Sequence, residues 1–240
     1  MYDPLQRADD VARVVCQGQR RKYYRFRPAR FYGGIATADC VGCCLGCYFC
    51  WSWHQITRPG AFGRFYSPEQ VAKKLLSICR RKGFWQVRIS GNEPTIAREH
   101  LLEVLRRIPE EVHFILETNG ILIGHDPGYA EALAPFANLH VRVSLKGSTE
   151  EEFSRLTGAL PAGFALQEKA LEHLAAAGVS AHPAVMISFS SDADIDALRR
   201  RLARIRPHFA EFEVEELALY GDVDERLERV GIAYHSAYRP

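Results

Sequence analysis

Strand-like and helical runs alternate along most of the chain, and this alternation limits the fold more than any other feature. Short apolar runs are followed by amphipathic runs about six times between residues 34 and 220. The predicted strands are residues 33–39, 84–90, 112–118, 139–147, 180–188 and 212–220, and the predicted helices are residues 67–83, 98–108, 127–136, 165–177 and 192–205. Repeated strand–helix units build parallel strands joined by right-handed crossovers, so an α/β fold is expected. Six units are too few for a closed eight-stranded barrel, and a partial barrel or an open doubly wound sheet both fit.

Four polar segments lie at the ends of predicted strands. They are residues 40–50 (CVGCCLGCYFC), 91–94 (GNEP), 117–120 (ETNG) and 144–147 (SLKG). In both architectures the ligand site lies beyond the carboxyl ends of the parallel strands. The sequence therefore predicts one site at which these four segments meet.

The composition indicates the cellular compartment of the protein but does not indicate its partners. The net charge of +2 and the pI of about 8.2 favour no class of partner. No apolar stretch reaches the 18 residues that a membrane span needs, and the first ten residues lack the apolar core of a secretory signal. Seven cysteines without such a signal indicate a reducing compartment, so we expect a cytoplasmic protein that does not contact the membrane. In that setting clustered cysteines are more often metal ligands or catalytic thiols than disulfides.

Five of the seven cysteines lie within the eleven residues from Cys40 to Cys50. Zinc is disfavoured because only three residues separate the pairs Cys40–Cys43 and Cys47–Cys50, which would strain four thiolates around one ion. A cubane iron–sulfur cluster fits better, because it offers several irons to a short loop.

Three ligand frames are open from the spacing alone. The first is a ferredoxin-like Cys-x2-Cys-x2-Cys run, which would need Cys16 or Cys79 as a distant fourth ligand. The others are two versions of Cys-x3-Cys-x2-Cys. The three frames use Cys44, Cys47 and Cys50; Cys43, Cys47 and Cys50; and Cys40, Cys44 and Cys47.

Cys43, Cys47 and Cys50, with Phe49 before the last cysteine, resemble the motif of the radical S-adenosylmethionine superfamily. The segment SGNEPT (90–95) is similar to the family's Gly-Gly-Glu-Pro loop, with Asn92 in place of the second glycine. The segments ETNG and SLKG are similar to those at the third and fourth strand ends of activating-enzyme relatives. The resemblance covers about residues 34–220 and is strongest to the branch of the pyruvate formate-lyase activating enzyme. It implies a partial (βα)6 barrel of parallel strands with outer helices.

The resemblance also selects the ligand frame and implies a role for each site residue. The aromatic at position 49 favours Cys43, Cys47 and Cys50 as ligands of a [4Fe–4S] cluster, which leaves Cys40 and Cys44 as small loop residues or residues that tune the cluster. Glycine at position 91 lets the backbone approach the cofactor closely. Glu93 would meet the methionyl ammonium, directly or through the backbone of its loop. The expected S-adenosylmethionine-binding residues are Phe49, Gly91, Asn92, Glu93, Glu117, Asn119, Ser144, Lys146 and Met186.

Within that set, Asn119 or Glu117 is expected at the ribose, and Ser144 and Lys146 at the ribose or the carboxylate. Phe49 and Met186 are expected at the adenine. An Asn-Gly turn, a loop lysine and a core methionine are the ordinary alternatives.

The resemblance implies reductive cleavage of S-adenosylmethionine to methionine and a 5′-deoxyadenosyl radical, which takes a hydrogen atom from a substrate. It also implies a flavodoxin-like or ferredoxin-like electron donor. Two competing classes are an iron–sulfur protein for electron transfer or structure, and a zinc-bearing nucleic-acid binder. Neither of these classes has a use for SGNEP and ETNG.

The stretch QRRKYYRFRPAR (19–30) interleaves six basic residues with aromatic residues and contains no acid. Such a pattern is typical of RNA binding, but it equally fits a charged edge strand or contact with a protein substrate such as a glycyl radical enzyme. The expected division of the chain is an extension over 1–33, the barrel over 34–220 and a tail over 221–240.

Overall fold

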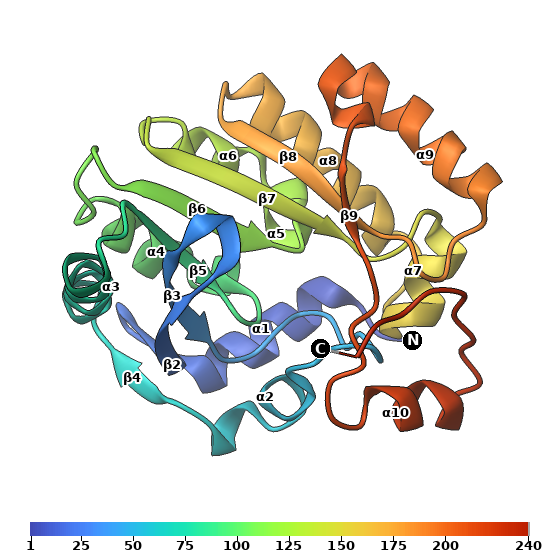
Figure 1. The fold of residues 1–240 in the computed structure, drawn as a ribbon, viewed down its shortest axis with the longest axis horizontal. Coiled ribbons are helices and arrows are strands. Elements are labelled where there is room, and N and C mark those ends of the chain that lie inside the picture. Colours follow the sequence, from blue (N-terminus) through green and yellow to red (C-terminus); the bar gives the residue numbers. More distant parts are fainter. Residues whose placement is uncertain (240) are drawn as a thin grey trace.

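The computed structural model describes residues 1–239, and a twisted sheet runs through the middle of this part of the chain (Figure 1). The order of its strands is β1-β2-β3-β5-β6-β7-β8-β9, with β4 paired to β2. The strands are β1 (Cys16–Gln17), β2 (Arg20–Ala29), β3 (Ile35–Cys40), β4 (Arg64–Tyr66), β5 (Gln86–Ser90), β6 (His113–Thr118), β7 (Leu139–Leu145), β8 (Ser180–Met186) and β9 (Glu213–Glu215).

Ten α-helices accompany the sheet within residues 1–239. They are α1 (Pro4–Val15), α2 (Trp53–Thr57), α3 (Pro68–Lys82), α4 (Arg98–Leu105), α5 (Ile121–His125), α6 (Pro127–Leu133), α7 (Glu150–Thr157), α8 (Gly163–Ala176), α9 (Asp192–Ile205) and α10 (Val223–Arg229). In this part of the chain, no helix combines the length and apolar character needed to cross a membrane.

Strands β3, β5, β6, β7, β8 and β9 pair in parallel and do not close on themselves, which confirms the predicted α/β partial barrel. All six predicted strands are present, but the last covers three residues instead of nine. The reason is that β8, its neighbour, ends at Met186, so residues beyond Glu215 find no further ladder partner.

Helix α3 shows how local sequence sets the element boundaries. The Ser67 hydroxyl accepts a hydrogen bond from the Gln70 amide, and the Gln70 side chain accepts one from the Ser67 amide, so the two residues form a capping box. Gly83 ends the helix with φ +69°, a left-handed conformation that glycine adopts without a steric penalty.

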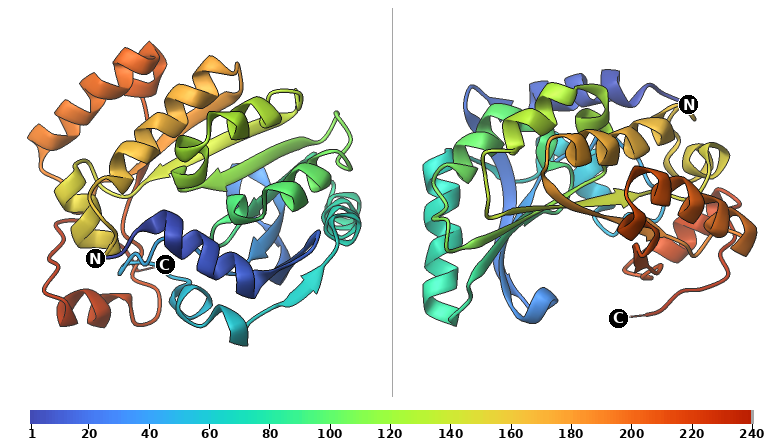
Figure 2. Two further views of the ribbon diagram at one scale, coloured as in Figure 1. Left: turned by 180° about the vertical axis from the view of Figure 1, so that it is seen from behind. Right: turned by 90° about the horizontal axis from the view of Figure 1, so that it is seen from above.

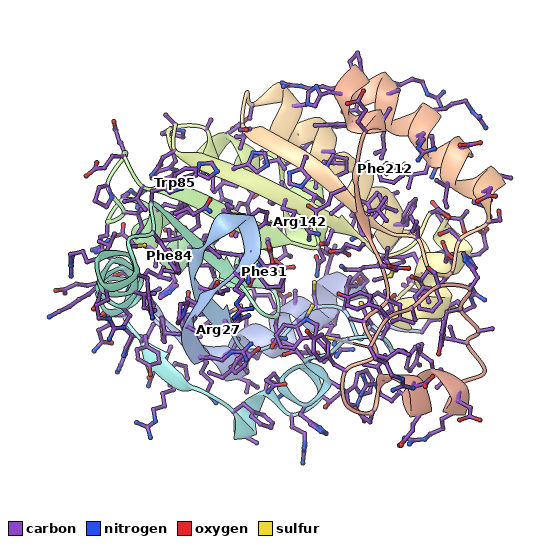
Figure 3. The ribbon with its side chains drawn as sticks, viewed as in Figure 1. Arg27, Phe31, Phe84, Trp85, Arg142 and Phe212 are labelled. Carbon is purple, nitrogen blue, oxygen red and sulfur yellow. The ribbon has the colours of Figure 1, made fainter. Side chains whose placement is uncertain are left out.

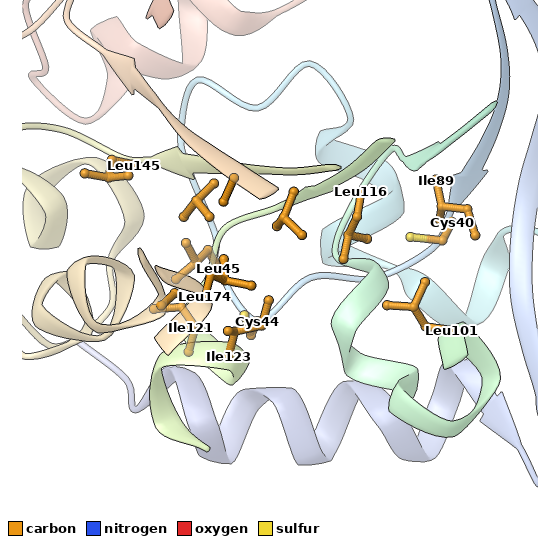
Figure 4. Packing of buried hydrophobic residues seen from close by; sticks show 14 of the residues in the cluster. Cys40, Cys44, Leu45, Ile89, Leu101, Leu116, Ile121, Ile123, Leu145 and Leu174 are labelled. Atoms are coloured by element: carbon orange, nitrogen blue, oxygen red, sulfur yellow. The ribbon is translucent and has the colours of Figure 1, made fainter. Parts of the chain in front are cut away.

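The two faces of the sheet differ in chemistry. Helices such as α3 and α8 cover one face, against which alternate strand residues such as Ala38, Ile89 and Leu116 pack as a buried core (Figures 2 and 4). The residues between them point to the opposite face and are mostly polar. This open face carries Arg25, Arg27, Thr37, Asp39, Arg88, Ser90, Glu117, Arg142, Ser144, Glu213 and Glu215.

The basic stretch 19–30 is part of the sheet, because β2 pairs antiparallel with β3 and with β4. Tyr23 faces the helix side and is buried, and its hydroxyl lies 3.0 Å from His100 Nε2. The segment over residues 1–33 therefore shares both the sheet and the core with the rest of the chain.

Candidate active site

The cysteine loop leaves β3 and lies at the carboxyl ends of the strands. Cys47 is buried, and Cys43 and Cys50 are half-buried. Burial raises the pKa of Cys50 to about 11 and raises that of Cys47 further, and the neighbouring cysteines add to both effects. The pKa of Cys43 is instead lowered, chiefly because the Cys44 thiol donates to it. Three mutually interacting thiols, one buried and two half-buried, fit a positively charged iron cluster, which would supply the counter-charge that their thiolates need.

The Cys43 sulfur also accepts N–H donors, as a cluster ligand would. The Leu45 amide lies 3.3 Å and the Asn119 side-chain amide 3.5 Å from Cys43 Sγ. Among residues 1–239, no three Cys, His, Asp or Glu side chains gather closely enough to hold a single metal ion.

Cys40 and Cys44 occupy different surroundings. Cys40 ends β3 in the helix-side core, and Figure 4 shows it at the Ile89 and Leu101 end of that core, apart from Cys44. Burial raises the pKa of Cys40 to about 12. The Cys44 sulfur accepts a hydrogen bond from Asn119 Nδ2 at 3.2 Å, so Cys44 is held against the end of β6.

The loop after β5 is tied directly to the cysteine loop. Asn92 Oδ1 accepts from the Gly42 amide at 2.8 Å, and the Glu93 amide donates to the Gly42 carbonyl at 3.0 Å. Gly91 has φ +101°, and a Cβ there would lie 2.7 Å from Asp39 Cα. Glycine is therefore required at this crossing for both its conformation and its size.

Glu93 is fully buried, and its carboxylate is satisfied by the protein. One oxygen accepts from the Thr95 amide, the Thr95 hydroxyl and the Thr118 hydroxyl, and the other accepts from the Asn119 amide at 2.8 Å. Burial raises the pKa of Glu93, and these donors oppose the rise. With four protein donors, Glu93 holds the ends of β5 and β6 together, which favours a role through its loop backbone over direct contact.

The two residues expected at the ribose lie apart. Asn119 is buried and points to Cys43 and Cys44, as described above. Glu117 lies on the open face, where Arg88 Nη1 donates to it at 2.8 Å and the Tyr32 hydroxyl at 3.1 Å.

Ser144 and Lys146 extend from the end of β7 and meet Glu215 of β9. The Ser144 hydroxyl donates to Glu215 at 2.9 Å, and Lys146 Nζ lies 3.4 Å from its other oxygen. Burial opposes the charge of Lys146, but the Glu215 carboxylate outweighs burial and the pKa of Lys146 is raised. Lys146 opposes the rise in the pKa of Cys47, so this charged group lies near the cysteine loop.

The two apolar residues expected at the adenine are buried near the same edge. Phe49 packs against Phe189, with ring centroids 5.6 Å apart, and Met186 ends β8 with 6% of its surface exposed.

Sequence reasoning missed three charged residues that shape the site. Arg142 Nη1 donates to Glu215 at 2.7 Å, and Arg226 of α10 donates to the carbonyls of Tyr48 (2.9 Å) and Cys50 (2.8 Å). The alternation of acids in EVE (213–215) was a usable signal for Glu215. Arg226 lies 176 residues from Cys50 and had no signal.

Comparison with known proteins places this arrangement in a family. The profile of the radical SAM superfamily matches residues 39–202, which is more than half of the chain, and the chain therefore belongs to this superfamily. Members of the family use a [4Fe–4S] cluster and S-adenosylmethionine, which agrees with the cofactors expected above. The resemblance to the activating-enzyme branch stays a prediction.

Two similar proteins align with part of this chain and with less than half of their own length. A probable GTP 3′,8-cyclase of Pyrococcus horikoshii is 31% identical over 117 residues, which cover 48% of this chain and 35% of the relative. The mycofactocin maturase MftC of Mycobacterium ulcerans is 29% identical over 175 residues, covering 69% and 45%. The chain thus spans about a third to less than half of the length of these two relatives.

Solved structures show the same fold. Streptococcus suis SuiB bound to the precursor peptide SuiA has a TM-score of 0.61 at 18% identity, covering 82% of this chain and 44% of SuiB. SuiB bound to S-adenosylmethionine has a TM-score of 0.57 at 20% identity, covering 80% and 45%.

Proposed function

We propose that this protein binds a [4Fe–4S] cluster through Cys43, Cys47 and Cys50 and uses S-adenosylmethionine for radical chemistry on a substrate not yet identified. When bound, these groups supply reductive cleavage to methionine and a 5′-deoxyadenosyl radical, which removes a hydrogen atom from the substrate. The observation that carries the proposal is the junction between two loops. Gly42, next to Cys43, is hydrogen-bonded to both Asn92 and Glu93.

The surroundings of the cysteines support the ligand frame. Cys43 accepts two N–H donors, whereas Cys40 lies in the helix-side core. Hydrogen bonds to the sulfurs are among the features that tune iron–sulfur clusters. In this proposal Asn119 orients Cys43 and Cys44 in addition to its expected contact with the ribose.

The remaining residues of the site would hold S-adenosylmethionine against the cysteine loop. Gly91 and Asn92 present backbone and amide groups beside Gly42, and Glu93 fixes that backbone. Ser144 and Lys146 supply polar groups from β7. Phe49 and Met186 supply apolar contact for a base. Glu117, on the open face, would accept from a ribose hydroxyl or from the substrate.

The proposal includes a low-potential electron donor of the flavodoxin or ferredoxin type and a cytoplasmic location. The substrate is a small molecule, an RNA or a protein, for example one with a glycyl residue. The alternative function is an iron–sulfur protein for electron transfer or structure that does not bind S-adenosylmethionine.

The test is anaerobic. The protein is reconstituted with iron and sulfide, reduced with dithionite and mixed with S-adenosylmethionine, and 5′-deoxyadenosine is measured by chromatography. We expect its formation in the wild-type chain and in Cys16→Ala, and its loss in Cys50→Ala. A complete cluster whose EPR spectrum does not change with S-adenosylmethionine, together with no product, would favour the electron-transfer alternative.

The ligand frame has its own test. Iron content and the visible spectrum are compared for Cys43→Ala and Cys40→Ala after reconstitution. We expect cluster loss only in the former, and the opposite result would select Cys40, Cys44 and Cys47.

A further inference from the structure

The β2 end of the open face brings three arginines together on adjacent strands. The strand register places Arg27, Thr37 and Arg88 in one row across β2, β3 and β5, and Arg25, Asp39 and Ser90 in the next. Partners in register share a face of the sheet, so these side chains all point away from the helices. Figure 3 shows Arg27 at the β2 end of this open face, and Arg142 farther along it.

The charges of Arg25 and Arg27 on β2 are only partly neutralised by acidic side chains. Asp39 Oδ2 accepts Nε of Arg25 at 2.6 Å and Nε of Arg27 at 3.0 Å, so one carboxylate serves two guanidinium groups. Within residues 1–239, neither arginine donates any other side-chain hydrogen bond. The Arg25 and Arg27 side chains are 41% and 26% exposed, whereas Asp39 is fully buried. The paired outer nitrogens of both arginines are therefore available to a ligand, and a guanidinium edge binds carboxylate and phosphate in bidentate fashion.

Three buried polar atoms in the same two rows lack a partner. They are Thr37 Oγ1, Asp39 Oδ1 and Arg88 Nε, as far as the described residues show. Thr37 and Asp39 are fully buried and Arg88 is 5% exposed. Buried polar groups without hydrogen bonds are costly and are rare in native proteins. Thr37 Oγ1 and Arg88 Nε can both donate to an anion, and their position beside two half-used arginines indicates a site for one. Asp39 Oδ1 is an acceptor and would not be satisfied by an anion.

Exposed aromatic rings border the arginines. The Arg25 guanidinium lies 5.6 Å from the Trp51 ring centroid, and the Arg88 guanidinium lies 4.9 Å from that of Phe31. Trp51 and Phe31 are 48% and 57% exposed, which is high for such large apolar side chains. Trp51 directly follows Cys50, so the site adjoins the proposed cluster ligands.

We propose that Arg25, Arg27 and Arg88, with Phe31 and Trp51, form a substrate subsite that binds a small anionic group, a carboxylate or a phosphate. We call these five residues the arginine–aromatic subsite. The inference rests on the proposed function, because it assigns the anion to the substrate of the radical reaction. A single small anion fits better than an RNA strand, because the free guanidinium edges lie at one place instead of along an extended groove. In this proposal the basic stretch 19–30 contributes Arg25 and Arg27 of β2 to anion binding.

The test is an anion titration followed by tryptophan fluorescence. The reconstituted protein is titrated anaerobically with pyrophosphate, and separately with succinate, while chloride keeps the ionic strength constant. We expect a saturable change in emission that is lost in Trp51→Phe. Arg25→Gln combined with Arg27→Gln should weaken apparent binding at least tenfold. Arg81→Gln, on the exposed surface of α3, should have no effect.

A second variant tests the subsite by a change that should strengthen anion binding instead of weakening it. Asp39→Asn removes the carboxylate that competes for both arginines, so it should tighten binding of the anion. Circular dichroism and thermal unfolding show whether each variant is folded. A response to pyrophosphate alone identifies a phosphate ester, and a response to succinate alone identifies a carboxylate. Both results support the subsite.

The subsite is refuted if neither anion gives a saturable response, or if the folded arginine variants bind as wild type does. It is also refuted if only a single-stranded oligonucleotide binds, because the stretch would then be an RNA surface. The assay for 5′-deoxyadenosine separates the two proposals. If S-adenosylmethionine is cleaved but no anion binds, only the subsite is refuted. If an anion binds but S-adenosylmethionine is not cleaved, only the proposed radical function is refuted.

Discussion

Glu215 is the acid on which several charges of the open face depend, and its replacement by glutamine is a sharp test of the structure. Its carboxylate accepts hydrogen bonds from Arg142 Nη1 at 2.7 Å and the Ser144 hydroxyl at 2.9 Å, and it pairs with Lys146 Nζ at 3.4 Å. Glu215→Gln keeps the shape of the side chain but removes the charge. Lys146 then lacks its carboxylate partner, and Arg142 retains Glu213 as its carboxylate partner.

The size of the effect follows from the pKa of Glu215. Burial would raise this pKa, but Lys146 and Arg142 outweigh burial and lower it from 4.5 to about 2. At about 1.4 kcal/mol for each tenfold change in acidity, the lowering corresponds to about 3 kcal/mol. Because the folded-state pKa lies below the ordinary value, this stabilisation is fully present above about pH 4.5. It is lost as the pH falls through about 2.

The free energy of unfolding is measured by urea denaturation of the cluster-free chain with reduced thiols, between about pH 7 and about pH 3. At neutral pH we expect Glu215→Gln to lower it by about 3 kcal/mol, with the difference shrinking as the pH falls below about 4.5. Glu225→Gln, on the exposed side of α10, should change it by less than about 0.5 kcal/mol. A difference for Glu215→Gln below about 1 kcal/mol, or one independent of pH, would refute the reasoning.

Three further substitutions test how the loops are held. Asn92→Gly removes the acceptor for the Gly42 amide and should lower the free energy of unfolding by about 1 kcal/mol, and a thermal melt with no change would contradict this. Arg226→Met removes both hydrogen bonds to the cysteine loop, so the reconstituted cluster should bleach faster in air, and an unchanged rate would exclude this role. Gly124→Ala would place its Cβ 1.8 Å from a backbone oxygen of α8 and should cost about 3 kcal/mol in urea unfolding. Gly60→Ala, with no atom closer than 3.8 Å, is the matched control, and equal losses in the two would argue against the packing of α5 on α8.

Local signals in the sequence were sufficient for most elements of the fold. The capping box and the terminal glycine of α3 were both readable, and so were the six parallel strands. The true length of β9 was not readable, because it depends on where β8 stops. The pairing of β2 with β3 could not be predicted either, since a charged strand and an RNA-binding segment have the same composition.

In the candidate site, too, one part could be predicted from the sequence and another part could not. Cysteine spacing and the GNEP segment were enough to predict which loops meet, and the Gly42–Asn92 contact agrees with that prediction. The side-chain partners were not predictable. Glu117 faces Arg88 on the open side of the sheet, while Asn119, two residues on, faces the cysteine loop. Within a strand these two residues would share a face, but β6 ends at Thr118, so Asn119 lies in the turn beyond it and the alternation no longer applies.

Local signals were sufficient to predict the α/β class, the order of the loops at the strand ends and the cysteine motif, because periodicity, capping and ligand spacing act over a few residues. Three contacts became known from the folded chain alone: Asp39 accepts from two arginines, Glu215 neutralises Lys146, and Arg226 donates to the cysteine loop. These contacts join residues separated by 12 to 176 positions. Their existence depends on strand register and on the packing of distant elements, and no local pattern encodes either of these.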